Sequence, residues 1–131
     1  ASHFAFPRNI IPHSRLQVRN YPGECSASDQ SATKTCLDAY FLTYVYDPSQ
    51  GIPSFSEYMT RASWVIKQYR DAGFDFYCDF ESTLETCLGP LMTSACMNPD
   101  AFVKMYGLDQ MEAVNYATSY PLDSYMCHNK D

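Results

Sequence analysis

The chain has 131 residues and a net charge of −6, and it contains eleven Tyr, eight Phe and six Cys. A chain of this length is expected to form one domain, and its longest apolar run is too short to cross a bilayer, so we expect no membrane insertion. The excess of acids argues against nucleic acid as a partner, because the phosphate backbone attracts Lys and Arg and repels carboxylates.

Residues 1–24 are predicted to form an extended arm in front of a helical domain that spans residues 25–131. Prolines at three positions exclude a long helix in the arm. Residues 1–23 carry a charge of +3 and residues 24–131 a charge of −9, and the bases of the arm are Arg8, Arg15 and Arg19. The arm can fold back onto the acidic body or bind an anionic partner. We favour the first, because opposite charges within a Debye length attract each other before a partner arrives.

The first predicted helix begins near Ser28 or Asp29 and runs to about Tyr46. Either residue at its start can accept a hydrogen bond from a free backbone N–H. From Cys36 onward its apolar residues lie on all sides of the helix. A helix that is apolar all round is normally enclosed by other elements, so we expect this helix to be the centre of the fold.

The second predicted helix begins at a capping box formed by Ser54 and Glu57 and runs to about Ala72. Gly73 is expected to end it in the left-handed conformation. Trp64 lies on the face opposite to its apolar stripe and is expected to be in contact with water. The stripe repeats at intervals of three and four and consists of Phe55, Tyr58, Met59, Ala62, Val65, Ile66 and Tyr69.

Four further helices are expected, each bounded by Gly, Pro or a capping residue. Gly89 stops the third, Gly107 ends the fifth, and the sixth is expected to fade near Tyr120-Pro121. Their predicted ranges are Asp75 to Leu88, Leu91 to Met97, Asn98-Pro99 to Gly107, and Asp109 to about Tyr120. Asp109 and Glu112 are expected to form a capping box at the start of the last helix. The sequence therefore predicts an all-α fold, a single disulfide-stapled bundle of five to six helices with an extended N-terminal arm.

An even number of cysteines predicts three disulfides and an oxidising, extracellular compartment; the cysteines are Cys25, Cys36, Cys78, Cys87, Cys96 and Cys127. Zinc is disfavoured because the spacing offers no two close ligand pairs. Cys78 and Cys87 are separated by about 13 Å along one helix, too far for a disulfide. We expect each of Cys78, Cys87 and Cys96 to bond to one of the other three cysteines. This leaves six arrangements, and we favour those with a Cys36–Cys87 bond.

Candidate catalytic residues are sparse. The histidines, His3, His13 and His128, lie near the termini, where a general base is poorly held. No metalloprotease, hydrolase or phosphate-loop motif occurs. One acidic stretch could bind calcium or supply an acid–base pair, but its helical spacing favours a solvated face; it contains Asp71, Asp75, Asp79, Glu81 and Glu85. We therefore predict no enzymatic activity, no metal and no cofactor.

Trp64 is the main candidate for contact with a partner, together with Arg61, because Trp and Arg dominate the energetics of interfaces. The basic residues of the arm, Arg8, Arg15 and Arg19, are further candidates. The other interpretation of Trp64, which the sequence slightly favours, is that apolar residues of the arm cover it; these are Phe4, Phe6, Ile10 and Ile11. The many Tyr and Met residues are expected to form the core, and the alternative is that they line a cavity for a hydrophobic ligand.

Three features occur together in the C-terminal half: the run from Phe80 to Leu88, the single Cys96, and the stretch from Phe102 to Cys127, which begins Phe-x-x-Met-Tyr-Gly-Leu-Asp. On these features, about residues 25 to 127 resemble a large family of secreted nematode domains of unknown function. The resemblance implies secretion and an all-helical fold, and it supplies no catalytic residues.

Together these features predict a secreted, non-enzymatic binding module that recognises an extracellular protein or surface partner. The alternative is an extracellular carrier of a small hydrophobic ligand. The two differ in structure, because a carrier needs an enclosed apolar cavity, whereas an interaction protein needs an exposed apolar patch. The sequence leaves the oligomeric state open.

Overall fold

In the computed structural model, which describes residues 20–44, 46–68 and 72–128, the chain is all-α and contains three disulfides. These ranges hold five α-helices, three short 3₁₀ helices and no strand. The elements are α1 (Ala27–Thr43), η2 (Pro48–Gln50), α2 (Phe55–Gln68), α3 (Gly73–Leu88), η4 (Gly89–Thr93), η5 (Ala95–Met97), α4 (Pro99–Tyr106) and α5 (Gln110–His128). The predicted all-α class is confirmed.

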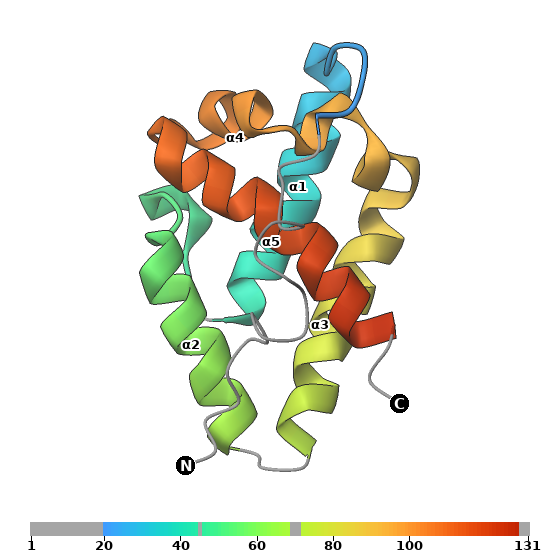
Figure 1. The fold of residues 1–131 in the computed structure, drawn as a ribbon. Coiled ribbons are helices and arrows are strands. Elements are labelled where there is room, and N and C mark those ends of the chain that lie inside the picture. The colour runs from blue at the N-terminus through green and yellow to red at the C-terminus, as the bar shows by residue number, and fades with distance from the viewer. Residues whose placement is uncertain (1–19, 45, 69–71, 129–131) are drawn as a thin grey trace.

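The helices form a bundle that α5 crosses (Figure 1). In this view α2 and α3 lie side by side, α5 crosses in front of α1, and α4 lies at the end of the bundle where α1 begins. α3 packs against α1, α2 and α5, and α4 packs against α5 and α1. The element that ties the bundle together is therefore α3 rather than α1.

α1 begins earlier than predicted because its N-cap is Ser26, whose Oγ accepts a hydrogen bond from the Asp29 N–H at 3.1 Å. It also ends earlier, at Thr43. It buries one face only, and Leu42 on the outer face is 56% exposed. The prediction that this helix is enclosed on all sides is wrong, because its outer face is in contact with solvent.

The backbone N–H groups at the start of α2 donate hydrogen bonds to two side chains, one local and one distant in sequence. The Ser54 Oγ accepts from the Glu57 N–H at 3.1 Å, as the predicted capping box requires. The Glu112 carboxylate, at the start of α5, accepts from the Phe55 N–H at 2.7 Å. A side chain distant in sequence therefore caps α2 together with Ser54, and it joins the N-terminal ends of α2 and α5.

Gly73 begins α3 instead of ending α2, so its predicted role as a helix C-cap is wrong. A Cβ atom on Gly73 would overlap the carbonyl oxygen of Ile66 in α2. Only glycine therefore allows the two backbones to approach this closely. The glycine is needed for packing between two helices, and not for a left-handed turn.

The chain between α3 and α5 largely follows the local signals. Gly89 ends α3 with φ of 53°, and Gly107 ends α4 in the left-handed conformation with φ of 64°. The predicted helix from Leu91 to Met97 is instead two 3₁₀ turns separated by Ser94. The Ser94 Oγ accepts from the Cys96 N–H and caps the second turn.

α5 continues past Pro121 to His128, so its predicted end near Tyr120 is wrong. An interior proline removes one backbone donor and costs a helix about 3 kcal/mol. The turn that follows is held by other contacts, since Asp123 and Met126 are buried and Cys127 is bonded to Cys78. Tertiary packing and a covalent bond override the local signal.

The three disulfides are Cys25–Cys96, Cys36–Cys87 and Cys78–Cys127. The favoured Cys36–Cys87 bond is confirmed, as is the rule that each of Cys78, Cys87 and Cys96 bonds to one of the other three. In the chain-entropy model, loops of this length contribute about 4 kcal/mol each. Because Cys78 and Cys87 point to opposite sides of α3, these two bridges tie α3 to α5 and to α1.

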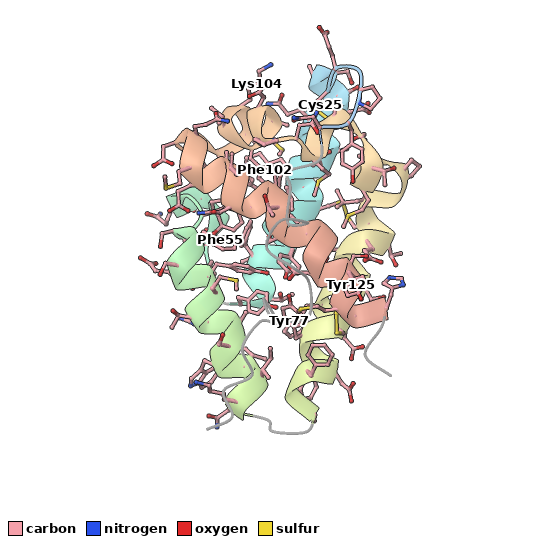
Figure 2. The ribbon with its side chains drawn as sticks, viewed as in Figure 1. Cys25, Phe55, Tyr77, Phe102, Lys104 and Tyr125 are labelled. Atoms are coloured by element: carbon pink, nitrogen blue, oxygen red, sulfur yellow. A yellow bond between two sulfur atoms is a disulfide. The ribbon has the colours of Figure 1, made fainter. Side chains whose placement is uncertain are left out.

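Aromatic rings fill the centre of the bundle. Tyr40 and Phe41 of α1 contact Tyr58 of α2 and the tyrosines of α5, with ring centroids 5.6 to 6.2 Å apart. Figure 2 shows Phe102 where α4 meets α5, and its ring stacks on Tyr116 and Tyr120. The expectation that the tyrosines form the core is confirmed for the buried set Tyr40, Tyr44, Tyr58, Tyr77, Tyr116 and Tyr120.

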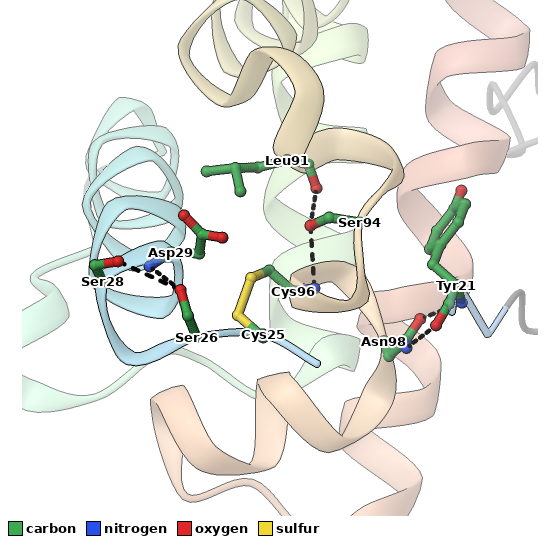
Figure 3. The surroundings of a disulfide bond; sticks show 9 residues. All are labelled: Tyr21, Cys25, Ser26, Ser28, Asp29, Leu91, Ser94, Cys96 and Asn98. Carbon is green, nitrogen blue, oxygen red and sulfur yellow. Dashed lines mark hydrogen bonds between the residues drawn. A yellow bond between two sulfur atoms is a disulfide. The ribbon is translucent and has the colours of Figure 1, made fainter. Parts of the chain in front are cut away.

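The chain in front of α1 is fixed to the junction of η5 and α4 (Figure 3). The Cys25–Cys96 bond lies there, and the Asn98 side chain faces the backbone of Tyr21 and forms two hydrogen bonds with it. Of the predicted arm, only residues 20–24 belong to the described part of the chain, and they form neither helix nor strand.

Candidate functional site

Trp64 lies on the outer face of α2, as predicted. The apolar stripe of α2 buries Tyr58, Ala62, Val65 and Ile66. Trp64 points away from this stripe and is 53% exposed. A large indole in contact with water on a helix of a small protein marks a surface that is suited to a partner.

An apolar groove of about 380 Å³ lies beside Trp64, between the end of α1, α2 and α3. Its floor and walls consist mainly of aromatic side chains, and we call this site the Trp64 surface. Its residues are Thr43, Tyr44, Arg61, Trp64, Val65, Phe76 and Phe80. The structure therefore brings the two predicted residues of the body, Trp64 and Arg61, into one site.

Two further hollows adjoin the same indole. One lies toward the start of α5, with Met59 and Glu112 in its wall, and the other lies toward Tyr46 and Glu57. Trp64 is the residue that these two hollows and the groove share. The indole is thus a ridge with concave surface on several sides, which is a shape that another molecule can enclose.

Arg61 is engaged within its own chain. Its Nη1 donates a hydrogen bond to the Tyr44 carbonyl at 3.1 Å, and its guanidinium lies 5.2 Å from the centroid of the Tyr46 ring. Burial raises the pKa of Tyr46, and the positive charge of Arg61 opposes that shift. Arg61 therefore holds the end of α1 against α2, beside the groove, in addition to any contact with a partner.

The candidate residues of the arm, Arg8, Arg15 and Arg19, lie outside the described residues. The hypothesis that Phe4, Phe6, Ile10 and Ile11 cover Trp64 also falls there. Both stay predictions.

A second unusual site lies inside the bundle and was missed by the sequence reasoning. Glu81 of α3 is 0% exposed and Asp123 of α5 is 2% exposed, and we call these residues the acid pair. Asp75 and Asp79 are exposed, as the predicted solvated face requires, and Asp71 lies outside the described residues. The assignment of Glu81 to that face is wrong, because Glu81 follows Tyr77 by four residues and shares its buried stripe.

Phenol groups surround the acid pair. Burial, followed by the nearby Asp123 and Glu85 carboxyls, raises the pKa of Glu81. Burial raises the pKa of Asp123 to about 7, and a hydrogen bond with Tyr77 partly opposes this shift. Because an ionised carboxylate is unfavourable in this interior, both groups favour the protonated form.

His128 remains at the exposed end of α5. Its Nε2 lies 3.2 Å from Glu85 Oε2, and its side chain is 65% exposed. This contact is a surface ion pair when the histidine is protonated, and it leaves the imidazole unattached to any nucleophile among the residues described. The acid pair is sealed from solvent, so the chemistry open to it in this conformation is the uptake and release of protons.

Metal ligands do not gather in the described ranges, where no group of three or more His, Cys, Asp or Glu is arranged to hold an ion. All six cysteines are in disulfides. Within the same ranges, no helix combines the length and the apolar character that a membrane span requires.

No known protein family, curated protein or solved structure matches this chain. The resemblance to secreted nematode domains therefore stays a prediction, and the function has to be inferred from the Trp64 surface and the acid pair.

Proposed function

We propose that this protein is a secreted, non-enzymatic binding module that recognises an extracellular protein partner through the Trp64 surface. The observation that carries the proposal is the exposed indole of Trp64 beside a groove lined by Tyr44, Phe76 and Phe80. Exposed aromatic residues beside concave apolar surface are typical of the centre of a protein interface.

Three disulfides support an extracellular location. Such bonds persist in oxidising compartments and are rare in the cytosol. The bridges tie α3 to both α1 and α5 and fix the chain in front of α1. A cross-linked bundle of this kind holds a surface in one geometry, which lowers the entropy lost when a partner binds.

A carrier of a small hydrophobic ligand is the second candidate. The groove volume of about 380 Å³ falls in the range of small-molecule sites, and its lining is mainly apolar. Against this candidate, stacked and edge-on rings occupy the centre of the bundle, where a carrier would enclose its ligand. The protein partner is therefore the better-supported proposal.

The test uses Trp64→Ala and a matched control, Met111→Ala. Met111 is the most exposed large apolar residue of the described chain, at 75%, and it does not line the Trp64 surface. A partner is captured from extracellular fluid, purified, and titrated against each variant. We expect Trp64→Ala to weaken binding at least about tenfold and Met111→Ala to leave the dissociation constant unchanged. Equal effects of the two substitutions would argue against the Trp64 surface.

Trp64 is the only tryptophan, so its fluorescence reports directly on this surface. A partner that covers the indole shifts its emission to shorter wavelength. The same shift on titration with a fatty acid, together with lipid in native mass spectra of the purified protein, would favour the carrier. If substitution of Phe4 and Phe6 by Ser shifts the emission of the free protein to longer wavelength, the arm covers Trp64; the proposed function requires no shift.

A further inference from the structure

The acid pair lies where a disulfide brings two helices together. Cys78 precedes Glu81 by three residues on α3, and Cys127 follows Asp123 by four residues on α5. The Cys78–Cys127 bond holds the Cα atoms of these cysteines 5.4 Å apart. Because residues three or four apart share a helix face, the bridge and both carboxyls belong to the same contact between α3 and α5.

Three of the four carboxyl oxygens of the pair lack a hydrogen-bond partner, and the fourth belongs to Asp123, which interacts with Tyr77. Both carboxyl oxygens of Glu81 and the Oδ2 of Asp123 are buried without a hydrogen-bond partner among the described residues. The buried hydroxyl of Tyr120 also lacks a hydrogen-bond partner among the described residues. A buried ionised carboxylate is stable only when paired and hydrogen-bonded, so this environment strongly opposes ionisation.

The titratable groups that face the pair are acids and phenols. They are Tyr40 and Tyr44 from α1, Tyr58 from α2, Tyr77 and Glu85 from α3, and Tyr120 from α5. His128, the basic residue at the end of α5, pairs with Glu85 at the surface. Among the residues that the structure describes, no positive charge compensates a carboxylate formed in this interior.

We propose that Glu81 and Asp123 form a proton-operated lock between α3 and α5, closed when both carboxyls are protonated and weakened as they release protons to solvent. In the open state each carboxyl that has lost its proton is negatively charged and is stabilised by hydration. The Cys78–Cys127 bond keeps α5 attached, so opening admits water between the two helices without detaching them.

The lock has a defined dependence on pH. Between the ordinary pKa of a carboxyl and its raised value in the fold, the folded protein binds more protons than the unfolded chain, so its stability falls as pH rises through that interval. For Asp123 this interval runs from 3.8 to about 7. The equilibrium constant of unfolding rises with pH. For each proton that the folded protein retains and the unfolded chain has lost, the rise is up to about tenfold per pH unit.

The two surfaces nearest to the lock share side chains with it. Tyr44, whose ring lines the Trp64 surface, faces both carboxyls. Tyr120, which faces them from α5, also lines a smaller pocket with Tyr21 and Met97. A carboxylate formed at the acid pair therefore lies next to the groove of the Trp64 surface. The lock itself does not depend on the proposed function.

The test measures urea unfolding from about pH 4 to about pH 8 for the unsubstituted protein, Glu81→Gln, Asp123→Asn and the control Asp79→Asn. The amides keep the shape of the carboxyls and cannot ionise, whereas Asp79 is an exposed acid on the same helix. We expect the unfolding constant of the unsubstituted protein to rise steeply with pH. Each amide should flatten this rise and lower the constant at about pH 8 by tenfold or more. Asp79→Asn should retain the steep rise.

A second measurement needs no substitution. Carbon-13 NMR of the side-chain carboxyls should show two groups that titrate well above the ordinary carboxyl range of about 4. The proposal is overturned if every carboxyl titrates in the ordinary range or if stability does not fall between about pH 4 and pH 8. It is also overturned if calcium or magnesium chloride raises the melting temperature at about pH 8 and Asp123→Asn abolishes that rise, because the pair would then hold a cation and not protons.

Discussion

The Asn98 side chain binds the backbone of Tyr21 on both sides: its Oδ1 accepts from the Tyr21 N–H at 2.8 Å, and its Nδ2 donates to the Tyr21 carbonyl at 2.9 Å. Asn98 occupies the N-cap position of α4, yet its side chain makes no capping hydrogen bond. Its contribution to stability therefore comes from fixing the chain that precedes α1, beside the Cys25–Cys96 bond.

Replacement of Asn98 by Ala should lower the free energy of unfolding by about 1 to 3 kcal/mol, because two partly buried backbone groups lose their partner. Asn98→Asp is the matched comparison, since it keeps the acceptor for the Tyr21 N–H and places an acceptor against the Tyr21 carbonyl. Hydrogen exchange of the Tyr21 amide should accelerate more in the Ala variant than in the Asp variant. Equal acceleration in both would show that the Oδ1 contact is not protective.

Glu112 joins α5 to the first turn of α2. Glu112→Ala should destabilise the protein by about 2 kcal/mol, because the Phe55 N–H loses a charged acceptor at 2.7 Å. Glu112→Gln retains an acceptor oxygen without the charge and should cost less. Urea denaturation measures both values. An Ala variant as stable as the unsubstituted protein would mean that water caps α2 equally well.

Gly73 is required by the approach of α3 to Ile66. Gly73→Ala should destabilise the fold by about 1 to 3 kcal/mol, because the added methyl group meets the Ile66 carbonyl oxygen and forces the helices apart. Ser82→Ala, at an exposed position of α3, should leave the melting temperature nearly unchanged. If Gly73→Ala has the same melting temperature as Ser82→Ala, the close contact is not present in solution.

The buried tyrosines should resist ionisation. Burial raises the pKa of Tyr40, Tyr58 and Tyr120 well above 10, so the folded protein retains protons that the unfolded chain loses. The free energy of unfolding should therefore fall as pH rises above about 10. Ultraviolet absorbance should show these phenolates only when circular dichroism reports unfolding. Their appearance near pH 10 in a folded protein would contradict this burial.

Tyr58→Phe provides the control for that titration. It removes one of the late-ionising phenols, together with the 2.6 Å hydrogen bond between the Tyr40 and Tyr58 hydroxyls. The absorbance change that accompanies unfolding (the late phase) should decrease by the amplitude of one tyrosine. The change near pH 10, from exposed tyrosines (the early phase), should stay the same. A loss from the early phase would place Tyr58 at the surface.

Local rules were sufficient wherever a feature depends on one helix alone. Helix periodicity places Cys78 and Cys87 on opposite sides of α3. It therefore excluded a bond between them and left the set of disulfide arrangements that includes the observed Cys36–Cys87 bond. The exposure of Trp64 follows from the same periodicity. The ends of α3 and α4 at Gly89 and Gly107 follow from backbone conformations that glycine adopts without strain.

Contacts between helices decided the remaining features. The helical spacing of the acids predicts a solvated face for Glu81, although its spacing from Tyr77, Leu84 and Leu88 places it on the buried stripe of the same helix. Pro121 is held inside α5 by packing and a disulfide on the turn that follows. The sequence by itself thus determined the location of the five α-helices, the apolar stripe of α2 and the outward direction of Trp64, because these depend on periodicity within a few turns. Only the tertiary structure decided that two carboxyls meet in the core and that Gly73 lies where two backbones approach closely, because both depend on which helix lies opposite.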